Sequence, residues 1–233
     1  MFKGTSASAG IGIGKAVIVE EAELVITRNE VADAEGEIQR FRGALEKTIA
    51  ATQKMADDLA SRVGEKEAEI MQGHMMLLSD PMLTGEIESS IRNDKVNSEF
   101  AIENVCSMYA DMFASMGDEL MQQRATDMRD IKVRMQRTLM GLESVDVSLL
   151  PKGSILVAKD LTPSMTAGIN PENVSGIVTE LGGKTSHSAI LARALEIPAV
   201  VAVNGLMDAV KDGDSVVLDG STGEVFVNPE ASV

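Results

Sequence analysis

The sequence predicts a mixed fold in which an α/β subdomain carries an inserted all-α subdomain. Short β-type runs occur at the start of the chain and return near its end, whereas the long stretch between them has helical periodicity and no proline except Pro81. Two amino-terminal strands are too few to stand alone, so we expect them to join the later strands in one sheet. The α/β subdomain is therefore expected at residues 1–24 and 146–233, with the helical insertion at residues 25–145.

Composition restricts the class of protein. The chain has 233 residues, of which 44% are hydrophobic, so it can bury a sizeable core. Its formal net charge of −15 argues against a nucleic-acid-binding face, and we expect no nucleic-acid partner. Cys106 is the sole cysteine, which excludes an intramolecular disulfide and fits a reduced, cytoplasmic protein. The first residues lack the apolar run of a signal peptide, and no stretch is apolar for long enough to insert into a membrane.

Two short strands are expected around a glycine-rich turn at the amino terminus. The first covers residues 2–7 and the second residues 15–19, on either side of the sequence GIGIG. These glycines resemble a dinucleotide-binding fingerprint, but their spacing differs and a strand follows where that fingerprint needs a helix. We therefore interpret Gly10, Gly12 and Gly14 as turn and close-packing glycines.

Residues 29–143 have the pattern of amphipathic helices. Pro81 follows Ser79 and Asp80, as expected for the first turn of a new helix. Because amphipathic helices bury their apolar faces against one another, we expect two packed helical hairpins. Mostly apolar residues recur every three or four positions in three sets, which are Ile38, Phe41, Leu45, Ile49, Thr52, Met55, Leu59 and Val63; Ile102, Val105, Tyr109, Met112 and Met116; and Ile131, Met135, Thr138 and Leu142.

The last part of the chain reads as short strands separated by turns and short helices. A tight hairpin is expected at Gly220–Gly223, between the last two strands. This pattern predicts an α/β unit. The expected strands are residues 154–158, 176–178, 198–203, 215–219 and 224–227.

The turn that follows the strand at 176–178 has the composition of a phosphate-binding loop. Gly182 and Gly183 permit a tight turn with an exposed backbone. Either Thr185 or Ser186 can cap the helix that follows. Together these residues predict free backbone N–H groups at a helix start, where an anion binds readily.

His187 lies in the first turn of that helix, at the positive end of its dipole. This location disfavours the imidazolium form, so the ring stays neutral and nucleophilic, and it favours the dianion once the ring is phosphorylated. Lys184 and Arg193 can supply further positive charge. A lone histidine at a helix start is usually structural, but here two glycines, two hydroxyl caps and a basic residue converge on it. No neighbouring side chains complete a metal site, so we expect no metal.

The segment GGKTSHSAILARALEIPAVV closely resembles the active-site signature of the Enzyme I family, the phosphoenolpyruvate-protein phosphotransferases of the bacterial phosphotransferase system. Lys184 stands where that family commonly has arginine, which keeps the charge but loses a bidentate contact. Other segments resemble the family in the expected order, so the resemblance spans the chain. They are ASAGIGIGKA, GHMMLLSDPML (73–83), DMRDI (127–131), DLTPSMTA (160–167) and DGSTGEVFVNP (219–229).

The resemblance implies a phosphoryl transfer. His187 takes the phosphoryl group of phosphoenolpyruvate and passes it to the histidine of the phosphocarrier protein HPr, the first step of sugar uptake by this system. Thr166 matches a threonine that hydrogen-bonds to the active histidine. We expect this chain to be the amino-terminal part of the enzyme, without the barrel that binds phosphoenolpyruvate and magnesium, and hence without a cofactor of its own. The fragment should be monomeric, and the full-length enzyme a homodimer.

The resemblance also assigns HPr docking to the helical insertion. Residues 30–143 carry 22 acidic and 13 basic side chains, a net charge of −9 that suits a basic partner. Twelve methionines lie between Met55 and Met140, and we expect most of them to fill gaps between helices. The expected HPr contacts are Glu67, His74, Met76, Leu77, Asp80 and Arg129.

Two other readings compete with this one. The first is the swivelling phosphohistidine domain of a pyruvate phosphate dikinase or phosphoenolpyruvate synthase, which lacks the insertion at 29–143. The second is a helical interaction module with a degenerate phosphate site, against which the intact surroundings of His187 argue. The sugar and nitrogen branches of Enzyme I share the motifs, and both stay open.

Overall fold

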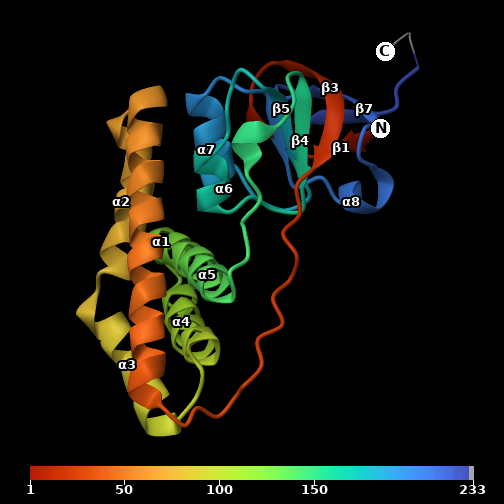
Figure 1. Ribbon diagram of the computed structural model, residues 1–233. Coiled ribbons are helices and arrows are strands. Elements are labelled where there is room, and N and C mark those ends of the chain that lie inside the picture. The colour runs from red at the N-terminus through yellow and green to blue at the C-terminus, as the bar shows by residue number, and fades with distance from the viewer. Residues whose placement is uncertain (231–233) are drawn as a thin grey trace. The chain divides into compact units, whose positions relative to one another are not determined.

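The computed structural model describes residues 1–230, and these divide into two compact units (Figure 1). The first unit joins Met1–Glu21 to the part of the chain that begins at Val145, and the second is Ala22–Ser144. The first unit holds a sheet with short helices, and the second is helical. The predicted fold class is thereby confirmed.

The first unit is built on one eight-stranded sheet within the described residues. Strand order is β1-β8-β7-β3-β4-β5-β6-β2, and β3 to β6 are parallel neighbours while the other pairs are antiparallel. The strands are β1 (Phe2–Lys3), β2 (Thr5–Ser8), β3 (Ile11–Ile18), β4 (Ser154–Ala158), β5 (Val174–Thr179), β6 (Ala199–Val201), β7 (Ser215–Asp219) and β8 (Glu224–Val227).

The sheet closes on itself through the first residues of the chain. Its two edges, β1 and β2, are separated by Gly4 alone, so one extended segment pairs with β8 on one side and with β6 on the other. A Cβ atom at Gly4 would lie 2.7 Å from the carbonyl oxygen of Val201, so this crossing requires glycine. The single strand expected at 2–7 is therefore two strands, because the segment changes partner at Gly4.

Two apolar layers hold this unit together. Inside the closed sheet, side chains such as Ile155, Val178 and Leu218 form one buried cluster. A second cluster lies between the sheet and the short helices α6 (Pro163–Ala167) and α7 (His187–Ala194). Burial on both faces explains why β4 is apolar from Ile155 to Ala158 and why every residue of β5 except Ser175 is buried. The remaining short elements are the 3₁₀ helix Val147–Leu149 and α8 (Leu206–Ala209).

The second unit, described throughout, has five helices. Figure 1 shows α2 and α3 following each other beside the long α1, while α4 packs against α5. The two expected hairpins are present, but one arm is broken, because Asp80 caps and Pro81 begins a separate helix. The helices are α1 (Ala34–Arg62), α2 (Glu65–Leu78), α3 (Pro81–Asp94), α4 (Ser98–Ser115) and α5 (Glu119–Met140).

Candidate functional site

The loops that follow β4, β5 and β6 meet at the carboxyl ends of these parallel strands, where α/β sheets commonly bind ligands. The loop after β5 is held from both sides. The N–H of Leu181 donates to the carbonyl of Lys159, 2.8 Å away, and the N–H of Ala202 donates to the carbonyl of Leu181, 3.3 Å away. The glycine-rich loop thus has a fixed entry point.

His187 is the first residue of α7 and is half-buried. Ser186 caps the helix by accepting a hydrogen bond from the N–H of Ala189 at 3.3 Å, which decides between the two expected caps. The Ser186 hydroxyl also donates to the carbonyl of Gly183 at 2.8 Å, whereas Thr185 is exposed. The predicted setting of His187, at a capped helix start after a tight turn, is present in the structure.

The two loop glycines have different reasons to be glycine. Gly182 adopts a φ of +102°, in the region that disfavours side chains. Gly183 has no such angle, and a Cβ built there would meet nothing within 4 Å. Gly183 therefore leaves open space beside the backbone, as a loop that admits a phosphate needs.

Arg193 holds the backbone of this loop. Its guanidinium donates to the carbonyl of Ala7 on β2 at 2.9 Å and to the carbonyl of Lys184 at 3.0 Å. We expected Arg193 to supply charge to the phosphate, but two of its donors are used on backbone oxygens. Lys184 is exposed and leaves its ammonium at the loop surface.

Thr166 lies on α6, which packs against α7, and its side chain is buried. Its hydroxyl lies 2.8 Å from the carbonyl of Pro163 and 3.1 Å from that of Thr162, so it donates its proton within its own helix. Toward an imidazole the same oxygen can then only accept. The expected bond to His187 stays a prediction, and it requires a ring N–H on the side of Thr166.

Asp160 is a residue of this loop cluster that the sequence did not suggest. It follows β4, next to Lys159, whose carbonyl holds the loop after β5. Desolvation raises the pKa of the Asp160 carboxyl, although the N–H of Leu161 donates to it at 2.9 Å. The sequence feature that could have identified Asp160 is its position at the start of the segment DLTPSMTA. A carboxyl that resists ionisation is less repulsive to a nearby phosphate.

The residues expected to contact HPr differ in their exposure to solvent. Met76 is exposed, and the Arg129 side chain is largely exposed beside Asp111. Glu67 and Asp80 are half-buried. Leu77 is partly buried against the helical core.

His74 departs from the expectation. Its side chain is 0% exposed, so it does not reach the surface in this structure. Helical geometry is the reason, because His74 lies on the side of α2 that also buries Met71 and Leu78.

The methionines also depart from the expectation. Within residues 55–140, all described, six of the twelve are exposed: Met76, Met82, Met108, Met112, Met116 and Met140. Met112 and Met116 were assigned to the buried face of α4, but that face turns toward Ala110 because 3.6 residues make a turn. Met108, Met112 and Met116, the last at the C-cap of α4, instead form an exposed row at intervals of four.

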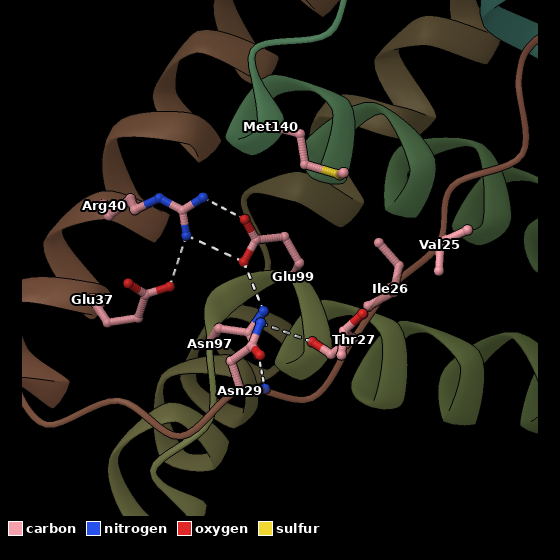
Figure 2. Close-up of a pocket in the computed structure, with 9 residues that line it drawn as sticks. All are labelled: Val25, Ile26, Thr27, Asn29, Glu37, Arg40, Asn97, Glu99 and Met140. Atoms are coloured by element: carbon pink, nitrogen blue, oxygen red, sulfur yellow. Dashed lines mark hydrogen bonds and ion pairs between the residues drawn. The ribbon is translucent and has the colours of Figure 1, made fainter.

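A pocket of about 310 Å³ lies in the helical unit, between residues 25–29 and the helices (Figure 2). Its polar groups pair with each other. Arg40 binds Glu99, and Glu37 at 2.8 Å, while the Asn97 side chain accepts from the N–H of Asn29 at 2.9 Å. Burial alone would raise the pKa of Glu99, but hydrogen bonds from Arg40 and Asn97 outweigh it and the pKa is lowered. The polar contacts around this pocket hold residues 25–29 against the helices, and among its lining residues, all described, they leave no reactive group exposed.

Two further features bear on the class of site. Among residues 1–230, no three acidic, histidine or cysteine side chains gather as metal ligands. In the same part of the chain, no helix has the length and apolar character to cross a membrane.

Comparisons with known proteins agree with this geometry. The family model described as the N-terminal part of PEP-utilising enzymes matches residues 3–124, and the model of their mobile domain matches residues 150–223. The chain is 41% identical over 230 residues to the phosphoenolpyruvate-protein phosphotransferase of Bacillus subtilis (strain 168) and 42% identical over 228 residues to that of Listeria monocytogenes. These alignments cover 99% and 98% of the chain but 40% of each relative.

Solved structures give the same result. The solution structure of an Enzyme I protein matches with a TM-score of 0.84 and 40% identity, covering 100% of this chain and 94% of that one. The N-terminal domain of the nitrogen Enzyme 1 matches with a TM-score of 0.64 and 25% identity, covering 100% and 95%. The chain belongs to the PEP-utilising enzyme family, and within that family its counterpart is the amino-terminal domain of Enzyme I.

Proposed function

We propose that His187 carries a phosphoryl group and exchanges it with the histidine of HPr. The observation that carries this proposal is the position of His187, half-buried at the capped start of α7 after the Gly182 turn. A neutral ring nitrogen attacks the phosphorus of phospho-HPr, and the P–N bond to the HPr imidazole breaks as the new P–N bond forms. Backbone N–H groups at the helix start stabilise the charge on the transferred group.

The surrounding residues have separate roles in this proposal. Arg193 keeps the loop backbone in place, and Lys184 offers its exposed ammonium to the phosphate. Thr166 accepts a hydrogen bond from the imidazole N–H, which leaves the other ring nitrogen with its lone pair for the phosphorus. Ser186 holds the turn and the helix start together.

HPr docks on the helical unit in this proposal. We propose that the exposed methionine row of α4, together with the exposed Met76 and Met82, provides the apolar docking surface, and we name these residues the methionine face (Met76, Met82, Met108, Met112 and Met116). Acidic residues such as Glu67 and Asp80 on α2 and at the start of α3 suit a basic partner. The exposed methionines support a protein partner, since large apolar side chains on a surface mark interaction sites.

The chain spans about 40% of the length of the curated relatives it matches. We propose that phosphoenolpyruvate, magnesium and dimerisation involve the part of those relatives outside the matched region. We also propose a cytoplasmic location, as fits an unpaired, buried Cys106.

The test uses the 233-residue chain mixed with phosphorylated HPr. Acid-labile phosphate should appear on the chain and map to His187, and the reaction should reverse when unphosphorylated HPr is added. His187→Ala should accept none and keep the circular dichroism of the wild type, since no core volume is lost. Labelling of His187→Ala would place the nucleophile elsewhere, and unfolding of that variant would give His187 a structural role.

A further inference from the structure

His74 is fully buried, yet it lies two residues from Met76, an exposed residue of the same helix. Its side chain is 0% exposed, whereas Met76 is 65% exposed. Two residues correspond to a rotation of about 200° around a helix, so the two side chains leave α2 on opposite sides. One side of α2 is therefore attached to the unit while the other presents a residue of the methionine face.

The attachment is polar and specific. His74 Nε2 lies 3.2 Å from Asp127 Oδ1, and Nδ1 lies 3.8 Å from Asp130 Oδ2. Both carboxylates come from α5, three positions apart and thus on one side of that helix, and both side chains are buried. A carboxylate oxygen only accepts, so the shorter contact assigns a proton to Nε2.

Gly73 and Arg124 complete this contact between α2 and α5. A Cβ atom at Gly73 would lie 2.6 Å from Arg124 Nη1, so glycine lets the guanidinium reach the backbone of α2. The same Nη1 lies 3.6 Å from Asp127 Oδ2. Asp127 is therefore held between a side chain of α2 and one of its own helix.

We propose that His74 is a positioning residue for partner docking: through Asp127 it fixes α2 on α5, and thereby sets the place of Met76 and of the α2–α3 junction at Ser79–Asp80. The proposal rests on the proposed docking of HPr. His74 does not touch the partner. Loss of its Nε2 proton leaves a buried carboxylate without that donor, which is costly, and α2 shifts to admit water or another donor.

The experiment compares two amides at position 74. Glutamine can place its Nε2 near the position of the imidazole Nε2 and reach Asp127, whereas asparagine is too short. Affinity for HPr is measured by calorimetry on the whole chain. His74→Gln should bind within about threefold of the wild type, and His74→Asn should lose about tenfold or more, as expected when a buried carboxylate loses a hydrogen-bond donor.

A double-mutant cycle distinguishes positioning from direct contact. Asp127→Asn should lower affinity as His74→Asn does, and the double variant should be no worse than either single one. Additive losses, or full affinity in His74→Asn, would overturn the proposal. Arg92→Gln is the control, because it breaks an ion pair between α3 and α1 at Glu35 (2.8 Å), away from this contact, and should leave affinity unchanged.

Hydrogen exchange of the free chain separates this proposal from the proposed function. His74→Asn should speed exchange of α2 amides while α4 and the α/β unit keep wild-type protection. If wild-type chain fails to bind HPr, the docking function is wrong, and α2 exchange still reports the attachment. Unchanged exchange in α2 would show that His74 does not hold that helix.

Discussion

Arg193 donates a hydrogen bond to the carbonyl oxygen of Lys184 across 3.0 Å, and so joins the last turn of α7 to the loop that precedes the helix. The second guanidinium bond, to Ala7, extends the connection to β2. One planar group thus connects α7, the loop that precedes it and the distant strand β2. The residue adjoining the phosphate loop therefore has its backbone position set by a side chain nine positions later.

Replacing Arg193 tests whether it positions the loop or contacts the phosphate. Arg193→Lys keeps the charge but cannot bond two carbonyls in the fork geometry. We expect Arg193→Lys and Arg193→Met to slow phosphoryl transfer similarly, by about tenfold, because small misplacements of reacting groups are costly. Rapid-quench measurements with phospho-HPr should show reduced kcat with unchanged KM. Near-normal transfer by Arg193→Lys alone would indicate a charge contact instead.

Asp80 combines a cap with a surface charge. Its carboxylate accepts a hydrogen bond from the N–H of Met82 at 2.8 Å. Asp80→Ala should lower the free energy of unfolding by about 1 kcal/mol, whereas Asp80→Asn keeps an acceptor and should cost much less. Both should slow association with HPr, more at low salt than at high salt. Urea unfolding and stopped-flow binding measure the two effects, and equal stabilities would exclude a capping role.

Met112 lies in the centre of the exposed row on α4. Met112→Gln should speed dissociation of HPr about fivefold with little salt dependence, since removal of an apolar contact acts mainly on the off-rate. Met140→Gln is the control, because Met140 is also exposed but lines the pocket of Figure 2. Identical off-rates for both variants would place the docking surface elsewhere.

Asp160 should make the protein less stable at neutral pH. Because desolvation raises its pKa in the folded state, ionisation destabilises the fold, and the stability present at low pH is lost as pH rises through that pKa. Asp160→Asn keeps the acceptor for Leu161 and should be more stable than the wild type at pH 7. The advantage should disappear as pH falls below the ordinary aspartate value of about 4. Thermal unfolding of both proteins between about pH 4 and pH 7 measures this difference in stability. A difference that does not change with pH would contradict a raised pKa of Asp160.

Cys106 should be inert in the folded chain. Burial raises its pKa to about 12, so almost no thiolate exists at pH 8. Ellman's reagent should label it only when the helical unit unfolds, and the labelling rate should rise in urea. Rapid labelling of the native protein would show that the core around α4 opens readily.

Local patterns predicted the elements that depend on near neighbours. The strands at 154–158, 215–219 and 224–227 have the expected bounds, and α7 begins at the expected residue. The signals for these elements, which are hydrophobic patterning, a hairpin turn and a capping hydroxyl, are each encoded within a few residues. The strand expected at 176–178 extends to Val174–Thr179, and that expected at 198–203 shortens to Ala199–Val201. Pairing partners set those limits.

Features that depend on distant contacts were not predictable. The sequence around His74 does not indicate that its side chain is buried beside Asp127. The sequence around Arg193 does not indicate that its guanidinium donates to the carbonyl of Ala7. The exposed side of α4 depended on which helices pack against it, so periodicity alone assigned Met112 to the wrong face. In each case the deciding partner is many residues away.

The closing of the sheet at Gly4 has a consequence for synthesis. Phe2 pairs with Val225 and Thr5 with Val201, so β1 and β2 must wait for strands that follow the whole helical unit in the sequence. The helical unit, with its local contacts, can fold during that wait, because low contact order makes folding fast. Since α7 packs against β2 and Arg193 bonds to Ala7, the surroundings of His187 are completed only after the helical unit has been synthesised. A nascent chain can therefore order the helices that we propose bind HPr before it orders the surroundings of His187, the proposed nucleophile.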